Sequence, residues 1–182
     1  MIFRWLFLII FIAIASTMLY VSFYIGLFRS AEVVQETRPG FYVVYQPHLG
    51  PYHKINPVIE EVEGWAQSVG INCPVSFGEY LDNPNSVDEH HLRSHGGCVI
   101  HKLIDDEDLP PGFASRFIPE GRFVVARFTG SPALGPIKVY PKAAKYIRRK
   151  QLQVADEVIE LYETVNHEFM TQYLFRILED QD

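Results

Sequence analysis

The N-terminal part of the chain is an unbroken hydrophobic run. Residues 5–28 carry no charged side chain and are bracketed by Arg4 and Arg29. As a helix that rises about 1.5 Å per residue, the run would be about 36 Å long, more than the roughly 30 Å of a bilayer's hydrocarbon core. A core helix of a water-soluble protein would show a polar stripe, which this run lacks. The pattern predicts a single-pass transmembrane anchor over residues 5–28.

A secretory signal peptide is the alternative interpretation of this run. Signal peptides have an apolar stretch of about 7–15 residues followed by a small-residue cleavage site. The run is longer than that, and residues 28–31 (FRSA) offer a poor cleavage site. A retained membrane anchor is therefore favoured. Arg4 and the free amine on one side nearly balance Arg29 and Arg38 on the other, so the positive-inside rule leaves the side of the membrane undetermined.

The rest of the chain shows the same succession of strand-like and helical patterns twice. Helical spacing of apolar residues predicts one helix from Asn56, a good N-cap, to Gly70 and another from about Pro141 to Gln151. Short runs rich in β-branched and aromatic residues predict strands around these helices. The predicted strands are Phe41–Gln46, Val75–Leu81, Cys98–Ile104, Arg122–Phe128, Val158–Tyr162 and Gln172–Leu178.

Corresponding segments of the two copies lie about 82 residues apart. Residues 78–80 (GEY), for example, correspond to residues 160–162 (ELY). The repeat predicts two halves, about 40–104 and 115–178, related by a pseudo-twofold axis. Residues 29–39 form the predicted connector from the anchor, in which Val33 and Val34 suggest a brief strand. Each half has one helix and cannot cover both faces of its own sheet, so we expect an α+β fold in which two helices back one antiparallel sheet. The open sheet face or the seam between the halves is the expected pocket.

The charge balance narrows the range of partners. Residues 29–182 hold all 22 acidic residues and 15 basic ones, the 16 of the chain less Arg4, for a net charge of −7. Nucleic acid and anionic lipid surfaces are therefore not expected to bind the domain as a whole. Cys73 and Cys98 permit one disulfide at most, and two buried thiols are the simpler interpretation.

The order of the segments resembles that of GyrI-like small-molecule-binding domains. The first half carries YQPHLGPYHKINPVIEEVEGW followed by GEYLDNP, and the second carries FVVARFTG, IELYET and QYLFRIL. The most specific pieces are residues 80–84 and 160–162, and the resemblance covers residues 40–178. Such modules also occur behind AraC-type and MerR-type DNA-binding domains, and the SOUL haem-binding-like proteins share the fold. The resemblance implies an effector-binding domain.

The whole layout is similar to one eukaryotic subgroup of this family. An anchor, a short connector and one GyrI-like domain also make up the testis-expressed receptors for selective autophagy of the endoplasmic reticulum. In those receptors part of the function resides in a long disordered tail. The present chain reaches Asp182 a few residues after the last predicted strand, so receptor function is not carried over.

Glu160 is the main candidate for ligand binding. The resemblance aligns it with the glutamate of the family's E-x-Y strand, a buried carboxylate that faces cationic aromatic ligands in drug-sensing relatives. A carboxylate among apolar neighbours attracts a cation or holds a proton, whereas on a wet sheet face it would be solvated. Tyr42, Trp65, Tyr80 and Tyr162 are the candidate aromatic walls. For Trp65, a place in the core on the apolar helix face is the competing interpretation.

A histidine-rich segment carries a weak signal for a metal. His91, His95 and Cys98 are ligand-type residues at plausible spacing. A fourth ligand and a fixed turn geometry are not evident, so a solvated loop is favoured. We expect no metal and no cofactor.

The sequence favours binding over catalysis. It contains no G-x-S-x-G, P-loop or H-E-x-x-H motif, so no catalytic residue is assigned. We expect a non-enzymatic, membrane-anchored domain that binds a small hydrophobic or cationic ligand. Two alternatives stay open: a membrane-tethered adaptor for a protein partner, and a hydrolase with Glu160 as general base, as in some GyrI-like relatives. An adaptor would dock through an acidic helix face or a basic one. The acidic face comprises Glu60, Glu61 and Glu63, and the basic face comprises Lys138, Lys142, Lys145 and Arg149.

Overall fold

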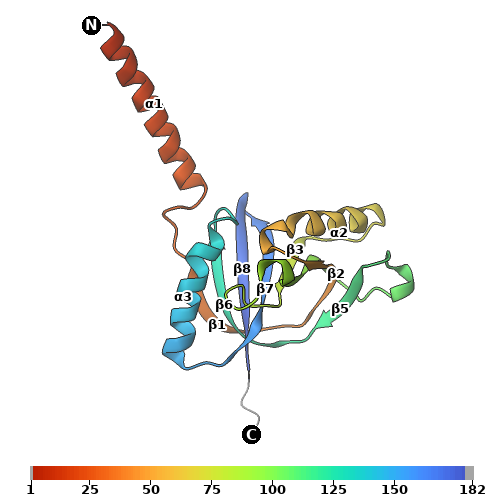
Figure 1. Cartoon of the computed structure of the whole chain (residues 1–182). Coiled ribbons are helices and arrows are strands. Elements are labelled where there is room, and N and C mark those ends of the chain that lie inside the picture. Colours follow the sequence, from red (N-terminus) through yellow and green to blue (C-terminus); the bar gives the residue numbers. More distant parts are fainter. Residues whose placement is uncertain (1, 179–182) are drawn as a thin grey trace.

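The computed structural model describes residues 2–178 and shows an α+β domain with a projecting N-terminal helix (Figure 1). Eight strands form one antiparallel sheet in the order β1-β6-β8-β7-β3-β4-β2-β5. Helices α2 (Asn56–Ser68) and α3 (Gly135–Lys150) pack on it, which confirms the predicted fold class. The strands are β1 (Glu32–Arg38), β2 (Phe41–Leu49), β3 (Val75–Tyr80), β4 (Arg93–Ile100), β5 (Ala114–Ile118), β6 (Gly121–Thr129), β7 (Val154–Val165) and β8 (Glu168–Ile177). Short 3-10 turns are η1 (Tyr52–Lys54), η2 (Glu89–His91) and η3 (Asp106–Asp108).

Helix α1 (Ile2–Tyr24) projects away from the domain (Figure 1). Its apolar part, Phe3–Tyr24, is 22 residues long and none of its most apolar stretch is buried. At about 1.5 Å per residue it can cross a bilayer, although a signal sequence passes the same test. The helix ends four residues before the predicted end of the anchor. Gly26 has a φ of +82°, a conformation that glycine adopts without a steric cost, and the chain turns there onto the domain.

The two sides of the sheet consist mainly of strands from the two predicted halves. The exceptions are β5, which lies at the start of the predicted second half and joins the first-half strands, and β1, which comes from the predicted connector and joins the second-half strands. The strand order reads β5-β2-β4-β3 on one side and β1-β6-β8-β7 on the other, so β3 and β7 pair at the seam. In this pairing Gly78 lies directly opposite Glu160, and these are the two residues that the sequence repeat aligns. The pseudo-twofold axis therefore passes through this pair.

Two edge strands depart from the sequence-based prediction. The predicted connector over residues 29–39 contains β1, which pairs with β6, so the connector shrinks to residues 25–31. Strand β5 was not predicted, and it pairs with β2. Both strands lie at sheet edges, where alternate residues are exposed or half-buried, and their hydrophobic pattern is correspondingly weak.

The starts of one strand and one helix also differ from the prediction. Strand β4 begins at Arg93, five residues before the predicted Cys98, because the glycines in RSHGGCVI are poor strand formers that nevertheless pair here. Helix α3 begins at Gly135 rather than near Pro141. Pro136 occupies its first turn, and Pro141, taken as the start, lies inside the helix.

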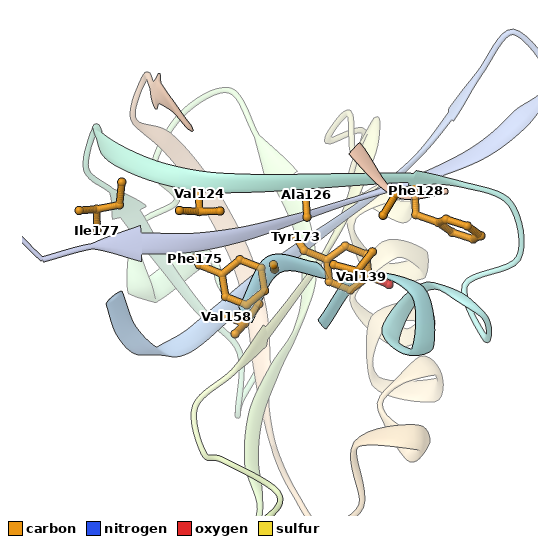
Figure 2. Packing of buried hydrophobic residues seen from close by; sticks show 10 residues of the cluster. Val124, Ala126, Phe128, Val139, Val158, Tyr173, Phe175 and Ile177 are labelled. Atoms are coloured by element: carbon orange, nitrogen blue, oxygen red, sulfur yellow. The ribbon is translucent and has the colours of Figure 1, made fainter. Parts of the chain in front are cut away.

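Each helix covers its own hydrophobic cluster, and a third cluster fills the opposite face of the sheet. Figure 2 shows the cluster under α3, where Val139 of the helix meets Tyr173 and Phe175 of β8 and Val124 and Ala126 of β6. These side chains are nearly fully buried. The α3 face of β7 and β8 is therefore an interior surface.

Cys73 and Cys98 form a disulfide, so the interpretation of two separate thiols is wrong. Their Cα atoms are 5.7 Å apart, within the usual range for such a bond. Both cysteines belong to the cluster under α2, Cys98 from β4 and Cys73 from the segment between α2 and β3.

Candidate functional site

A buried carboxylate lies at the seam between the two halves. Glu160 on β7 is only 5% exposed. The Tyr140 hydroxyl donates to its Oε1 at 3.0 Å, and the Tyr162 hydroxyl donates to its Oε2 at 3.0 Å. The Tyr80 hydroxyl lies 2.8 Å from that of Tyr162. Both carboxylate oxygens are thus held by neutral hydroxyl groups, which extend into a chain of three tyrosines.

Strand alternation and the seam explain this arrangement. Successive side chains of a strand point to opposite faces, so Glu160 and Tyr162 share the face covered by the helices, and Tyr80 joins them from β3. Tyr140 reaches Glu160 from α3. Gly78, opposite Glu160, leaves room for the rings, since a Cβ there would lie 3.2 Å from the Tyr162 hydroxyl oxygen.

The electrostatic environment of Glu160 is unusual for a buried acid. Within residues 2–178, no lysine, arginine or histidine forms an ion pair with it. Burial raises the pKa of Glu160 to about 7, against the opposing effect of the Tyr162 and Tyr140 hydrogen bonds. Burial, followed by the charge of Glu160, raises the pKa of Tyr140 and Tyr162 as well, so both stay neutral hydrogen-bond donors.

Two further hydroxyl groups next to this site make no hydrogen bond within the described residues. Thr171 and Tyr173 on β8 are fully buried, and they pair in register with Tyr162 and Glu160 respectively. Buried polar groups nearly always have a partner, either in the protein or in bound water. The neighbourhood of Glu160 therefore has unused hydrogen-bonding capacity.

The structure brings together three of the five predicted site residues, namely Glu160, Tyr162 and Tyr80. The other two lie against the cluster under α2. The Trp65 ring packs edge-on against Phe113 at 5.4 Å, and the Tyr42 ring packs on Phe117 at 4.9 Å. Neither takes part in the hydrogen-bonded chain around Glu160.

Sequence reasoning missed two tyrosines of this site. Tyr140 was placed outside the predicted helix because Pro141 was taken as its first residue. Tyr52 belongs to η1, where its ring lies 4.7 Å from that of Tyr80 and its hydroxyl donates to the Asp82 carbonyl oxygen at 2.7 Å. The repeat gave no signal for these two tyrosines, because Tyr52 precedes α2 whereas Tyr140 lies inside α3.

A second buried acid, Glu79, occupies the opposite face of the sheet and is fully paired. It forms an ion pair with Arg116 and lies 2.6 Å from His95 Nδ1. Burial acts to raise the pKa of Glu79, but His95 and Arg116 outweigh it and the pKa is lowered. This ion pair borders a cavity of about 290 Å³, and a second cavity of about 210 Å³ lies near Gly40. Neither cavity contacts Glu160.

Several of the remaining candidate residues are engaged in other contacts. Of the possible metal ligands, Cys98 is in the disulfide, His95 contacts Glu79, and His91 is exposed near Asp88. On the predicted acidic face of α2, Glu63 accepts a hydrogen bond from Ser76. Of the predicted basic face, two lysines bond to the connector instead of facing free solvent. They are Lys138, which reaches Leu27, and Lys142, which reaches Ser30 and Ala31.

Comparisons with known proteins agree with this architecture. A family model described as the GyrI-like small molecule binding domain matches residues 31–178. No curated protein matches the sequence. Among solved structures, EcmrR in its complex with DNA has a TM-score of 0.66 at 13% identity, over 82% of this chain and 58% of EcmrR. The chain thus spans less than two thirds of EcmrR.

Two other solved structures share the fold. SAV2435 bound to tetraphenylphosphonium has a TM-score of 0.51 at 12% identity, over 81% of this chain and 94% of SAV2435. A hydrolase from Listeria innocua has a TM-score of 0.52 at 10% identity, over 82% of this chain and 92% of the hydrolase. At these identities the likeness establishes the fold alone.

Proposed function

Because the chain belongs to the GyrI-like small-molecule-binding family, we propose that it binds a lipophilic organic cation at Glu160 and does so at a membrane. One observation carries the proposal: Glu160 is buried, and no positively charged side chain of residues 2–178 pairs with it. Among residues 2–178, the only other nearly fully buried acid, Glu79, has an arginine and a histidine as partners. A bound cation would give Glu160 the partner that its environment lacks.

The tyrosines fit the same kind of ligand. Tyr80, Tyr140 and Tyr162 surround the carboxylate, and the faces of such rings attract organic cations. Tyrosine hydroxyls that bond to Glu160 now would be displaced by the incoming cation. The buried hydroxyls of Thr171 and Tyr173 are available for a polar group of the ligand or for water that it carries.

The protonation of Glu160 couples ligand binding to pH. With a pKa of about 7, the carboxyl group is mostly protonated at pH 6 and mostly ionised at pH 8. Only the ionised form attracts a cation, so binding below pH 7 must release a proton. The affinity for a cation should fall about tenfold between pH 8 and pH 6.

The proposed setting is a bilayer crossed by α1, with the domain acting in sensing or sequestration. The net charge of −7 over residues 29–182 disfavours direct contact with nucleic acid. The DNA-bound structure of EcmrR does not extend to this chain, because the chain covers only 58% of EcmrR. We therefore propose a small-molecule ligand and no nucleic-acid partner.

The test uses the full chain in nanodiscs and tetraphenylphosphonium as the probe, with empty nanodiscs to correct for partitioning into lipid. Equilibrium dialysis at pH 8 should show saturable binding that the Glu160→Gln variant weakens at least tenfold. Glu163→Gln is the matched control, because it removes one negative charge from the same strand on the opposite face.

Equal affinity of the wild type and the Glu160→Gln variant would overturn the assignment of Glu160. The same samples can be tested for hydrolysis of small electrophilic esters. Turnover that is lost in the Glu160→Gln variant and kept in the Glu163→Gln variant would replace the binding function with a hydrolase, in which Glu160 acts as general base.

A further inference from the structure

The segment after α1 is attached to the domain through backbone contacts. The Ser131 N–H donates to the Ile25 carbonyl oxygen at 2.9 Å. Two glycines with positive φ make this approach possible: a Cβ on Gly26 would lie 2.9 Å from the Thr129 carbonyl oxygen, and a Cβ on Gly130 would lie 2.7 Å from that of Ile25. Such distances exclude a side chain at either position. The segment that follows α1 therefore packs tightly against the β6–α3 turn.

Three basic side chains complete the attachment. Arg29 belongs to the connector, and Lys138 and Lys142 belong to the first half of α3. The two lysines bond to the connector, and Arg29 pairs with the β7–β8 hairpin. The contacts are Lys138 Nζ to the Leu27 carbonyl oxygen (2.7 Å), Lys142 Nζ to Ser30 Oγ (2.8 Å) and the ion pair of Arg29 with Glu168. Helix α1 is thus connected to the domain by a fixed segment rather than a free tether.

Large apolar side chains are exposed around the point where α1 leaves the domain. Figure 1 shows the end of α1, the start of α3 and the start of β8 at one end of the domain. Phe28 is 63% exposed and Ile137 is 71% exposed, and the others are also exposed. We name this set the apolar rim, which comprises Leu27, Phe28, Ile137, Val165 and Phe169.

We propose that the apolar rim lies in the interfacial layer of the same bilayer that α1 crosses, an inference that rests on the proposed anchor role of α1. The rim would hold the domain in one orientation, with the β7–β8 hairpin and the start of α3 against the membrane. Its occupant is lipid and not a protein partner, because Leu27 and Phe28 directly follow α1 and continue its exposed apolar surface. The polar side chains among the rim residues, namely Asn166, His167 and the paired Arg29 and Glu168, are of the kind that the headgroup layer solvates.

This orientation brings the ligand site close to the lipid. Tyr162 precedes the rim residue Val165 by three positions on β7, which corresponds to about 10 Å along a strand. Tyr140 follows the rim residue Ile137 by three positions, which is about one turn of α3. The chemistry of the rim therefore points to a lipophilic cation that enters from the bilayer interface, past Tyr140 and Tyr162, toward Glu160.

The test uses tryptophan emission from the full chain in phosphatidylcholine nanodiscs, with and without bromine on the acyl chains. Ile137→Trp and Leu178→Trp are compared, both with Trp5→Phe, so that Trp65 is the only other tryptophan in each. Leu178 is an exposed control, because β8 runs from the rim residue Phe169 to Ile177, about 27 Å away.

Brominated lipid should quench the added tryptophan of the Ile137→Trp variant at least twofold and leave that of the Leu178→Trp variant unchanged. Equal quenching of the two variants, or none in the Ile137→Trp variant, would overturn the proposal. The wild-type chain separates the two possible failures. If Trp5 is not quenched, then α1 does not enter the bilayer and the anchor role is wrong. If Trp5 is quenched and the Ile137→Trp variant is not, then only the docked rim is wrong.

Discussion

Glu160 should make the protein less stable as the pH rises through neutrality, and the Glu160→Gln variant should remove this dependence. The pKa of Glu160 is about 7 in the folded protein, against an ordinary value of 4.5. Between these values the folded state holds a proton that the unfolded state has released. The free energy of unfolding that protonated Glu160 contributes is therefore fully present below pH 4.5 and is lost as the pH rises through 7.

The size of the effect follows from the pKa difference. A difference of roughly 2.5 pKa units corresponds to about 3 kcal/mol of unfolding free energy, most of it lost between pH 5 and pH 7. A glutamine is uncharged throughout this range and keeps both an oxygen and a nitrogen for the hydroxyls of Tyr140 and Tyr162, which can donate or accept. The variant should match the wild type at low pH and exceed its stability at pH 8.

The assay is urea unfolding of the full chain in detergent micelles at pH 5, 6, 7 and 8, with wild type and variant side by side. Trp65 reports on unfolding because it packs against Phe113 in the cluster under α2. The difference between the two proteins isolates Glu160, since every other titrating group is common to both. A difference that changes by less than about 0.5 kcal/mol from pH 5 to pH 8 would refute a neutral-range pKa for Glu160.

Two further predictions concern the connector and the paired acid. Gly26→Ala places a side chain at a φ of +82° and 2.9 Å from the Thr129 carbonyl oxygen, so it should weaken the attachment by about 1–2 kcal/mol, measured as faster amide exchange at Ser131. Arg116→Met should cost about 3 kcal/mol in urea unfolding, because it leaves the buried Glu79 without its guanidinium partner and with only His95 beside it.

Each of these changes has a matched control. Gly64→Ala in α2 meets no atom within 4 Å and should stabilise the protein by about 0.5–1 kcal/mol, because alanine favours a helix interior. If Gly26→Ala leaves amide exchange at Ser131 unchanged, the close approach of Gly26 to Thr129 does not stabilise the attachment.

Adding Glu79→Gln to Arg116→Met should recover about half of the lost unfolding free energy. No recovery would mean that Arg116 acts through packing rather than through charge.

The centre of the site could be predicted from the sequence, whereas its surroundings could not. The resemblance to the family's E-x-Y strand identified Glu160, with Tyr80 and Tyr162 as candidate aromatic walls. Strand alternation explains why these three residues share one face. Tyr140 escaped because a proline normally marks the start of a helix, and here Pro141 lies inside one. Its contact with Glu160 depends on where α3 packs, which is a tertiary property.

The same distinction holds for the fold. The duplicated core strands have clear apolar patterns and were predicted, whereas β1 and β5 lie at the edges with polar residues at exposed positions. The disulfide was missed for a related reason. The separation of Cys73 and Cys98 along the chain does not reveal that both lie in the cluster under α2, which depends on tertiary packing.

The pairing of Gly78 with Glu160 on the pseudo-twofold axis also determines what kind of chain can build this site. In a dimer of two identical halves, both positions on the axis would hold the same residue, at the short separation of paired strands. Two glutamates there would repel each other, and two glycines would provide no charge. A single buried carboxylate at this pair therefore requires two halves that differ in sequence. The divergence of the two halves, and not the symmetric scaffold by itself, is what allows an odd charge at the centre of the molecule.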